Sequence, residues 1–114
     1  MNAEKLLKLA DILDAAHAAG RHYDQTRFYY RGAPSCAWGY WADAHPERFR
    51  IAEDIVPLLK HGSTGLFLSD AAQDFGISEA DACELFGCWG CGRAITAEDA
   101  ARYIRDFVER HRSG

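Results

Sequence analysis

The four cysteines are the residues whose type and spacing come nearest to a chemical site. Cys88 and Cys91 are separated by two residues within the glycine-rich stretch 87–92. This spacing is typical of one half of a structural zinc site, in which thiolates bind the metal in close pairs. Cys83 lies shortly before this pair and Cys36 lies far upstream, so one hypothesis is a zinc ion held by all four thiolates.

The zinc pattern is incomplete, because only one close pair is present and Cys83 falls inside a predicted helix beside apolar positions. The alternative is that Cys36 and Cys83 are small core residues, and that Cys91 fixes a tightly packed connection. We favour this alternative and expect no metal and no cofactor. Since we expect a cytoplasmic chain, its cysteines should be reduced thiols.

Cys36 also raises the hypothesis of a cysteine nucleophile. It directly follows Ser35, a predicted helix N-cap, and a helix N-terminus lowers the pKa of a thiol. A base and an orienting carboxylate would complete the group; the candidates are His22, His45 or His61, with Asp24 or Asp43. No spacing selects among them, so we favour a buried structural cysteine and predict that the protein is not an enzyme.

The aromatic residues of the predicted helix 36–44 suggest partner binding instead. Trp38, Tyr40 and Trp41 follow three consecutive aromatics at 28–30, and tryptophan and tyrosine are enriched at the energetic centres of protein interfaces. The alternative is that they pack the centre of a small helical domain. We predict that Trp38, Tyr40 and Trp41 contribute to a binding surface.

Charge is unevenly distributed along the chain. The net charge of −4 argues against general nucleic-acid binding. Between Asp70 and Asp99 there are seven carboxylates and a single base, Arg93. Acidic residues are common in the first turns of helices, where they interact favourably with the positive end of the helix dipole. The other interpretation is an acidic face for a basic protein partner, formed by Asp70, Asp74, Glu79, Asp81 and Glu84.

The elements that must position these residues are mainly helices. Apolar residues recur at helical spacing in five segments, which we predict as helices at 3–19, 36–44, 66–75, 78–86 and from 96 onward. Ser78 and Thr96 are predicted N-caps, each with an aspartate three residues later. Gly39 weakens the second helix. A close approach by another helix would explain why a glycine stands at this position.

The least regular segment is 47–60. Residues 48–51 and 55–58 predict a small hairpin; alternatively, residues 55–58 form one helical turn. Pro57 argues against a continuous helix through this segment. Residues 28–31 predict a short strand or a packed extended segment. The whole chain, 1–114, fits one globular domain. We expect a mainly α, single-domain fold of about five helices with a short β-hairpin, soluble and cytoplasmic, without a membrane span.

The chain resembles a loose group of short phage and prophage proteins over about half its length. The similar parts are Gly32–Trp41, Leu85-Phe86, Gly90-Cys91-Gly92, and Thr96 with Ala100-Ala101 and Ile104. In that group a Cys-Gly-Thr-x-x-Cys-x-x-Gly-Trp pattern is followed by Leu-Phe, Gly-Cys-Gly and an amphipathic helix. Arg31 stands where the first cysteine of the pattern would be, which weakens a metal site built on it. The resemblance implies a phage context, and a host-cell cytoplasmic location, without a known activity.

Three candidate functions follow from these features of the sequence. We predict a non-enzymatic, phage-type accessory protein that binds a protein partner with a basic surface, in its most specific form an inhibitor of a host defence nuclease complex, similar in role to anti-CRISPR proteins. Neither nucleic acid nor membrane is an expected direct ligand. A small zinc-stabilised structural or regulatory module is the second hypothesis, and a cysteine-dependent enzyme is the third.

Overall fold

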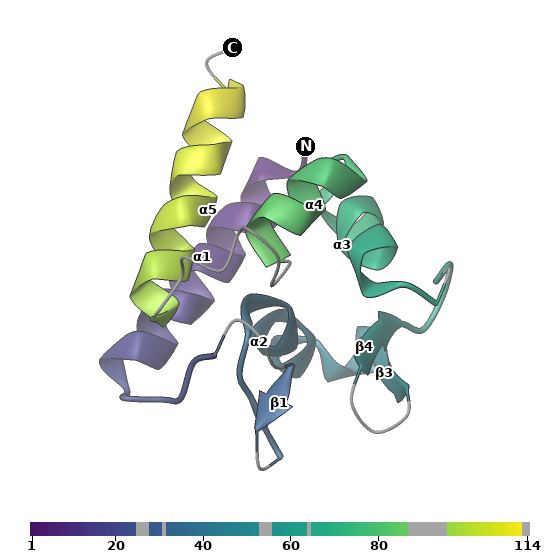
Figure 1. Cartoon of the computed structure of the whole chain (residues 1–114), viewed down its shortest axis with the longest axis horizontal. Coiled ribbons are helices and arrows are strands. Elements are labelled where there is room, and N and C mark those ends of the chain that lie inside the picture. Colours follow the sequence, from purple (N-terminus) through teal and green to yellow (C-terminus); the bar gives the residue numbers. More distant parts are fainter. Residues whose placement is uncertain (25–27, 31, 53–55, 64, 87–95, 113–114) are drawn as a thin grey trace.

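The first and last helices, α1 (Ala3–Ala18) and α5 (Ala97–Arg112), pack against each other along one side of the fold (Figure 1). The computed structural model describes residues 1–24, 28–30, 32–52, 56–63, 65–86 and 96–112. The apolar stripe of each helix is buried, with α1 contributing Leu6, Leu9 and Leu13, and α5 contributing Ile104, Phe107 and Val108. Helical spacing of these residues places them on one face, which explains the pairing.

Three shorter helices complete the mainly α architecture. Helix α2 (Ala37–Ala44) lies at the centre, and α3 (Phe67–Phe75) and α4 (Glu79–Phe86) form a helical hairpin beside α1 (Figure 1). Gly76 ends α3 in a left-handed conformation, φ +64°, which glycine adopts without strain. The five helices among the described residues confirm the predicted fold class. In the described part of the chain, no helix combines the length and apolarity needed to cross a bilayer.

Two small antiparallel hairpins flank α2. The first pairs β1 (Tyr29–Tyr30) with β2 (Ala33–Pro34). A 3₁₀ turn, η1 (Pro46–Arg48), leads into the second, in which β3 (Phe49–Ala52) pairs with β4 (Val56–Leu59). The second hairpin confirms one of the two predictions for the segment 47–60. Its proline, Pro57, is tolerated because a two-stranded sheet has only edge strands.

The helix caps agree with the sequence at two positions and differ at a third. The side chains of Ser78 and Thr96 each accept a hydrogen bond from a backbone N–H three residues on, both at 3.1 Å. The prediction that Ser35 caps α2 is wrong, because Cys36 occupies that position and makes no side-chain cap. The hydroxyl of Ser35 instead donates to the carbonyl of Asp24, at 3.4 Å.

Gly39 is a point of close approach, although the neighbour is not a helix. A Cβ atom built on Gly39 would lie 2.2 Å from the carbonyl oxygen of Phe28. That carbonyl accepts a hydrogen bond from the backbone N–H of Ser35, at 2.9 Å, which holds the extended segment against α2. The glycine is therefore required by the first hairpin, and the prediction of a neighbouring helix is wrong.

Candidate functional site

The aromatic residues predicted to bind a partner are core residues. Trp38 is 0% exposed, and Tyr40 and Trp41 are 1% exposed. The rings of Phe49, Phe75 and Phe86 surround the Trp38 indole at centroid distances of 5.2, 6.4 and 6.0 Å.

The polar atoms of these aromatics are bonded inside the chain. The Trp38 indole N–H donates to the Pro57 carbonyl at 2.7 Å, and the Tyr40 hydroxyl donates to the His22 carbonyl. Buried aromatic N–H and O–H groups need such partners. The prediction that Trp38, Tyr40 and Trp41 form a binding surface is therefore wrong, because they build the centre of the domain.

Two of the five predicted surface carboxylates are also buried. Asp70 accepts hydrogen bonds through Oδ2 from the backbone N–H of Leu59, at 2.9 Å, and from the Ser63 hydroxyl, at 2.7 Å. It therefore ties β4 and the following loop to α3. Asp74, one turn later, is buried with a side-chain exposure of 3%. The assignment of Asp70 and Asp74 to an accessible acidic face is wrong, because both are internal acceptors.

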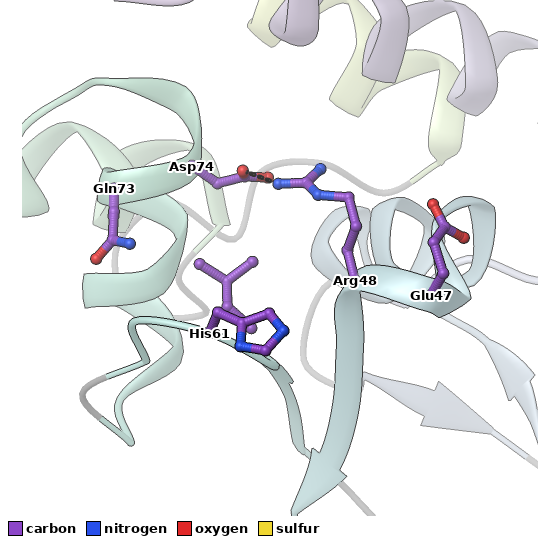
Figure 2. Close-up of a pocket in the computed structure, with 6 residues that line it drawn as sticks. Glu47, Arg48, His61, Gln73 and Asp74 are labelled. Carbon is purple, nitrogen blue, oxygen red and sulfur yellow. Dashed lines mark hydrogen bonds and ion pairs between the residues drawn. The ribbon is translucent and has the colours of Figure 1, made fainter.

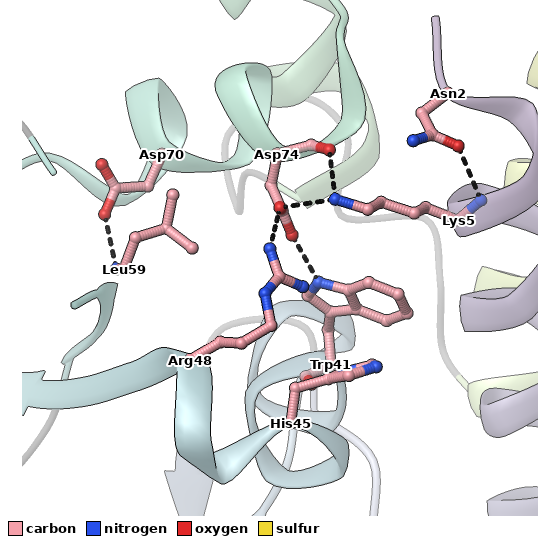
Figure 3. A network of polar contacts seen from close by, with 8 residues as sticks. All are labelled: Asn2, Lys5, Trp41, His45, Arg48, Leu59, Asp70 and Asp74. Atoms are coloured by element: carbon pink, nitrogen blue, oxygen red, sulfur yellow. Dashed lines mark hydrogen bonds and ion pairs between the residues drawn. The ribbon is translucent and has the colours of Figure 1, made fainter. Parts of the chain in front are cut away.

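Asp74 is the centre of a polar network that joins four segments (Figure 3). Its carboxylate accepts from the Trp41 indole N–H at 2.7 Å, from Lys5 Nζ at 3.0 Å and from Arg48 Nη2. Burial acts to raise the pKa of Asp74, but the three hydrogen bonds outweigh it, so the pKa lies below its ordinary value. A paired, ionised carboxylate at this position is thus a structural joint.

Two open hollows lie on either side of the Arg48–Asp74 pair. The first, the His61 hollow, has a volume of about 270 Å³ (Figure 2) and is lined by Glu47, Arg48, Leu59, His61, Gln73 and Asp74. The second, the Lys8 hollow, has a volume of about 260 Å³ and is lined by Asn2, Glu4, Lys5, Lys8, Trp41, His45 and Arg48. Arg48 lines both hollows, so a ligand in either one would meet its side chain.

His45 lines the Lys8 hollow, and one of its ring nitrogens is bonded within the chain. Its Nδ1 lies 2.9 Å from the carbonyl oxygen of Trp41. Since a carbonyl only accepts, Nδ1 carries the proton, and Nε2 is left as an acceptor in the neutral ring or a donor in the protonated ring. The imidazole also lies over the Trp41 ring, with centroids 4.2 Å apart. The ring is therefore oriented from both sides.

The other three predicted acidic residues lie on α4. Glu79 and Glu84 are exposed, and Asp81 is half-buried. Glu84 forms an ion pair with Arg110 at 3.4 Å, in which both side chains are about half exposed or more. In the described part of the chain, the carboxylates of Glu79 and Asp81 form no ion pair. The acidic face is thus smaller than predicted and is limited to α4.

The surroundings of Cys36 do not support its predicted role as a nucleophile. Cys36 is 2% exposed, and burial raises the pKa of its thiol to about 11, although the backbone N–H groups of Gly39 and Trp38 act in the opposite direction. The predicted pKa-lowering effect of the helix N-terminus is therefore outweighed. The candidate bases His45 and His61 line hollows that do not include Cys36.

The zinc hypothesis stays a prediction. Cys83 is half-buried on α4, whereas Cys88 and Cys91 lie outside the described residues. Within the described ranges, no group of three or more His, Cys, Asp or Glu side chains is arranged to hold a metal ion.

The basic residues around Asp74 were missed by sequence reasoning. Lys5 and Lys8 belong to an ordinary amphipathic helix, and nothing in the spacing connects them to Arg48. Comparison with known proteins adds no such connection, since no family model, curated protein or solved structure matches the chain. Function must therefore be argued from the chain's own surface.

Proposed function

We propose that this chain is a non-enzymatic binding protein that recognises a partner with a basic surface through the exposed side of α4. The observation that carries the proposal is the accessibility of Glu79, Asp81 and Glu84 on one short helix, with only Arg110 within ion-pair distance of any of them in the described part of the chain. Excess negative charge on one face steers a basic partner toward it and favours the correct orientation.

The sequence surrounding α4 strengthens the local charge. From Leu66 to Phe86 there is no lysine, arginine or histidine. The buried carboxylates of this stretch have their own donors, as the contacts of Asp74 with Lys5 and Arg48 illustrate. In the described part of the chain, Glu79 and Asp81 on α4 have no such counter-ion, so their negative potential extends into solvent. The exposed pair with Arg110 offsets it only weakly.

The more specific form of the proposal is an inhibitor of a host defence nuclease complex. It draws on the resemblance to short phage proteins and on the fact that a nuclease must present a basic surface to bind its nucleic acid. A small acidic protein that covers this surface would compete with the nucleic acid. The binding would then need no catalytic residue in the inhibitor.

A charge-neutralised variant tests the proposal. The triple variant E79Q/D81N/E84Q should lose inhibition of DNA cleavage by a purified RNA-guided nuclease complex, measured with increasing amounts of the chain. The matched control E4Q/D43N/E47Q removes the same number of exposed carboxylates from other elements and should inhibit as the unaltered chain does. Circular dichroism should show that both variants keep their helical content.

Salt dependence provides the second readout. Binding to the nuclease complex should weaken steeply as sodium chloride rises from about 0.05 to 0.5 M, because the Debye length falls several-fold. Equal loss in the triple variant and its control, or affinity indifferent to salt, would contradict recognition through α4. Failure to inhibit any nuclease while a basic partner is still bound through α4 would contradict only the inhibitor form.

A further inference from the structure

We propose that the Lys8 hollow is a binding site for a small phosphate monoester. The hollow lies between the first turns of α1, the end of α2 and η1, and its lining includes Lys5, Lys8, His45 and Arg48. It is on a different element from the acidic face of α4 and does not depend on the partner proposed above.

The charge balance of this region is positive, in contrast to the chain as a whole. Lys5, Lys8 and Arg48 are three cations, and the only carboxylates that line the hollow or contact its cations in the described structure are Glu4 and Asp74. One positive charge is left over, and a second is added when His45 is protonated. A chain of net charge −4 has therefore gathered cations around this hollow.

Asp74 does not satisfy the donors that it contacts. Of the five N–H groups of the Arg48 guanidinium, the described contacts use Nη2 toward Asp74. Lys5 directs its ammonium to the carboxylate and carbonyl of Asp74, at 3.0 and 3.3 Å. Lys8 is exposed and forms no ion pair within the described part of the chain. Donors from Lys8 and Arg48 are thus left for an anion, and the protonated ring of His45 adds one more.

The arrangement favours phosphate over a carboxylate. The donors come from three separate elements, and a phosphate dianion offers three terminal oxygens and two charges, whereas a carboxylate offers two oxygens and one charge. The Arg48 guanidinium is a fork suited to phosphate, and Lys8 is a flexible point charge. A volume of about 260 Å³ is at the small end of ligand pockets, which limits the ester to a small organic group.

Inorganic phosphate is the probe for the test. It is added to the ¹⁵N-labelled chain at pH 7 in a non-phosphate buffer, with ionic strength held constant by sodium chloride. Saturable shifts are expected for the Trp41 indole N–H and for the backbone amides of residues 2–8, 45, 47 and 48. Acetate at the same concentration should bind at least about threefold more weakly, because it carries one charge, whereas the phosphate dianion that is present at pH 7 carries two.

Three single substitutions locate the binding. Lys8→Gln should weaken phosphate binding about threefold or more, the value of one exposed charge pair. Glu4→Gln, which removes the competing carboxylate of the same hollow, should tighten it by a similar factor. Lys60→Gln is the matched control, since Lys60 is equally an exposed lysine but does not line the hollow.

The proposal fails if the shifts do not saturate, or if sodium chloride alone produces them. It also fails if Lys8→Gln and Lys60→Gln weaken binding equally, or if acetate binds as tightly as phosphate. None of these outcomes bears on α4, because the variants leave Glu79, Asp81 and Glu84 in place. Conversely, loss of nuclease inhibition in the α4 variant leaves the phosphate titration unaffected.

Discussion

The carboxylate of Asp74 unites residues that are distant in the sequence. Its donors lie 69, 33 and 26 residues away, in Lys5, Trp41 and Arg48. One of these donors is an indole that would otherwise be buried without a partner. A residue with such contacts determines how four segments meet, so its replacement should lower the stability of the fold before it affects any binding function.

Replacing Asp74 by asparagine should destabilise the protein by about 1–3 kcal/mol, because Lys5 and Arg48 lose their shared counter-ion. The pKa of Asp74 is lower in the folded state than in the unfolded chain. The ionised carboxylate therefore contributes fully to the free energy of unfolding above the ordinary aspartate pKa of about 3.9, and this contribution is lost as the pH falls through the lower pKa of the folded state. Urea unfolding between about pH 2 and pH 7 measures both effects.

Asp43→Asn, at an exposed position on α2, is the control for that substitution. It should change the free energy of unfolding by less than about 0.5 kcal/mol. If Asp74→Asn kept the same acid-dependent loss of stability as the unaltered protein, the assignment of that loss to Asp74 would be wrong.

Cys36 should be inert toward alkylation in the folded protein. A rise of its thiol pKa from 9.0 to about 11 leaves about a hundredfold less thiolate at neutral pH, and burial blocks access as well. Iodoacetamide treatment followed by peptide mass spectrometry should show Cys36 modified only after unfolding in urea. Rapid modification of Cys36 in the native protein would revive the cysteine-nucleophile hypothesis.

Individual residue environments were the part that sequence reasoning predicted least well. An aspartate such as Asp74 has the same local pattern whether it is exposed or buried, and its partners come from distant segments. Trp38 and Trp41 are likewise ambiguous, because tryptophan is as typical of a protein interface as of a core. Only the tertiary contacts decide between these, whereas Ser78 and Thr96 could be assigned because an N-cap bonds within three residues.

At the scale of elements, α2 is fixed by the backbone that crosses it. Gly39→Ala would normally stabilise a helix by about 1 kcal/mol. Here the added methyl would overlap the Phe28 carbonyl, so we expect a loss of about 1–3 kcal/mol in thermal or urea unfolding. Ala44→Gly in the same helix, exposed and free of that contact, should follow ordinary helix propensity. A stabilising Gly39→Ala would contradict the close approach.

The second hairpin depends on one hydrogen bond from α2. Trp38→Phe keeps an aromatic ring in the core but removes the indole donor to the Pro57 carbonyl. We expect a loss of about 1–3 kcal/mol, with faster amide hydrogen exchange at Leu59 and Lys60. Similar exchange rates in both proteins would mean that the Asp70 bond to Leu59 alone secures the hairpin.

The elements themselves were largely predictable, because helices and hairpins are encoded by local periodicity. The predicted segment 3–19 and the observed Ala3–Ala18 differ by one residue at the end. The start of α2 was placed one residue early, since Ser35 has the composition of a cap but uses its hydroxyl to bind the Asp24 carbonyl. The rule that predicts N-caps uses only neighbouring residues, so it cannot detect a competing hydrogen-bond partner such as the Asp24 carbonyl.

For the molecule as a whole, the apolar seam between α1 and α5 should matter more than its charged border. A chain that stops at residue 95 lacks α5 and exposes the stripe of Leu6, Leu9 and Leu13. We expect this chain to lose cooperative thermal unfolding, measured by circular dichroism. Arg105→Ala removes exposed ion pairs to Asp11 and Asp14, at 2.9 and 2.6 Å, and should cost about 1 kcal/mol or less. Cooperative melting of the shortened chain would contradict the seam's role.

The pairing of α1 with α5 also sets the order of events during synthesis. Most small helical proteins fold quickly because their contacts are local, but here α1 must wait for α5, with about eighty residues of chain between them. While the ribosome adds those residues, the leucine stripe of α1 lacks the cover that α5 supplies in the native fold. Native burial of this stripe is therefore completed only after α5 has left the ribosome, and until then α1 is the segment that a chaperone would bind.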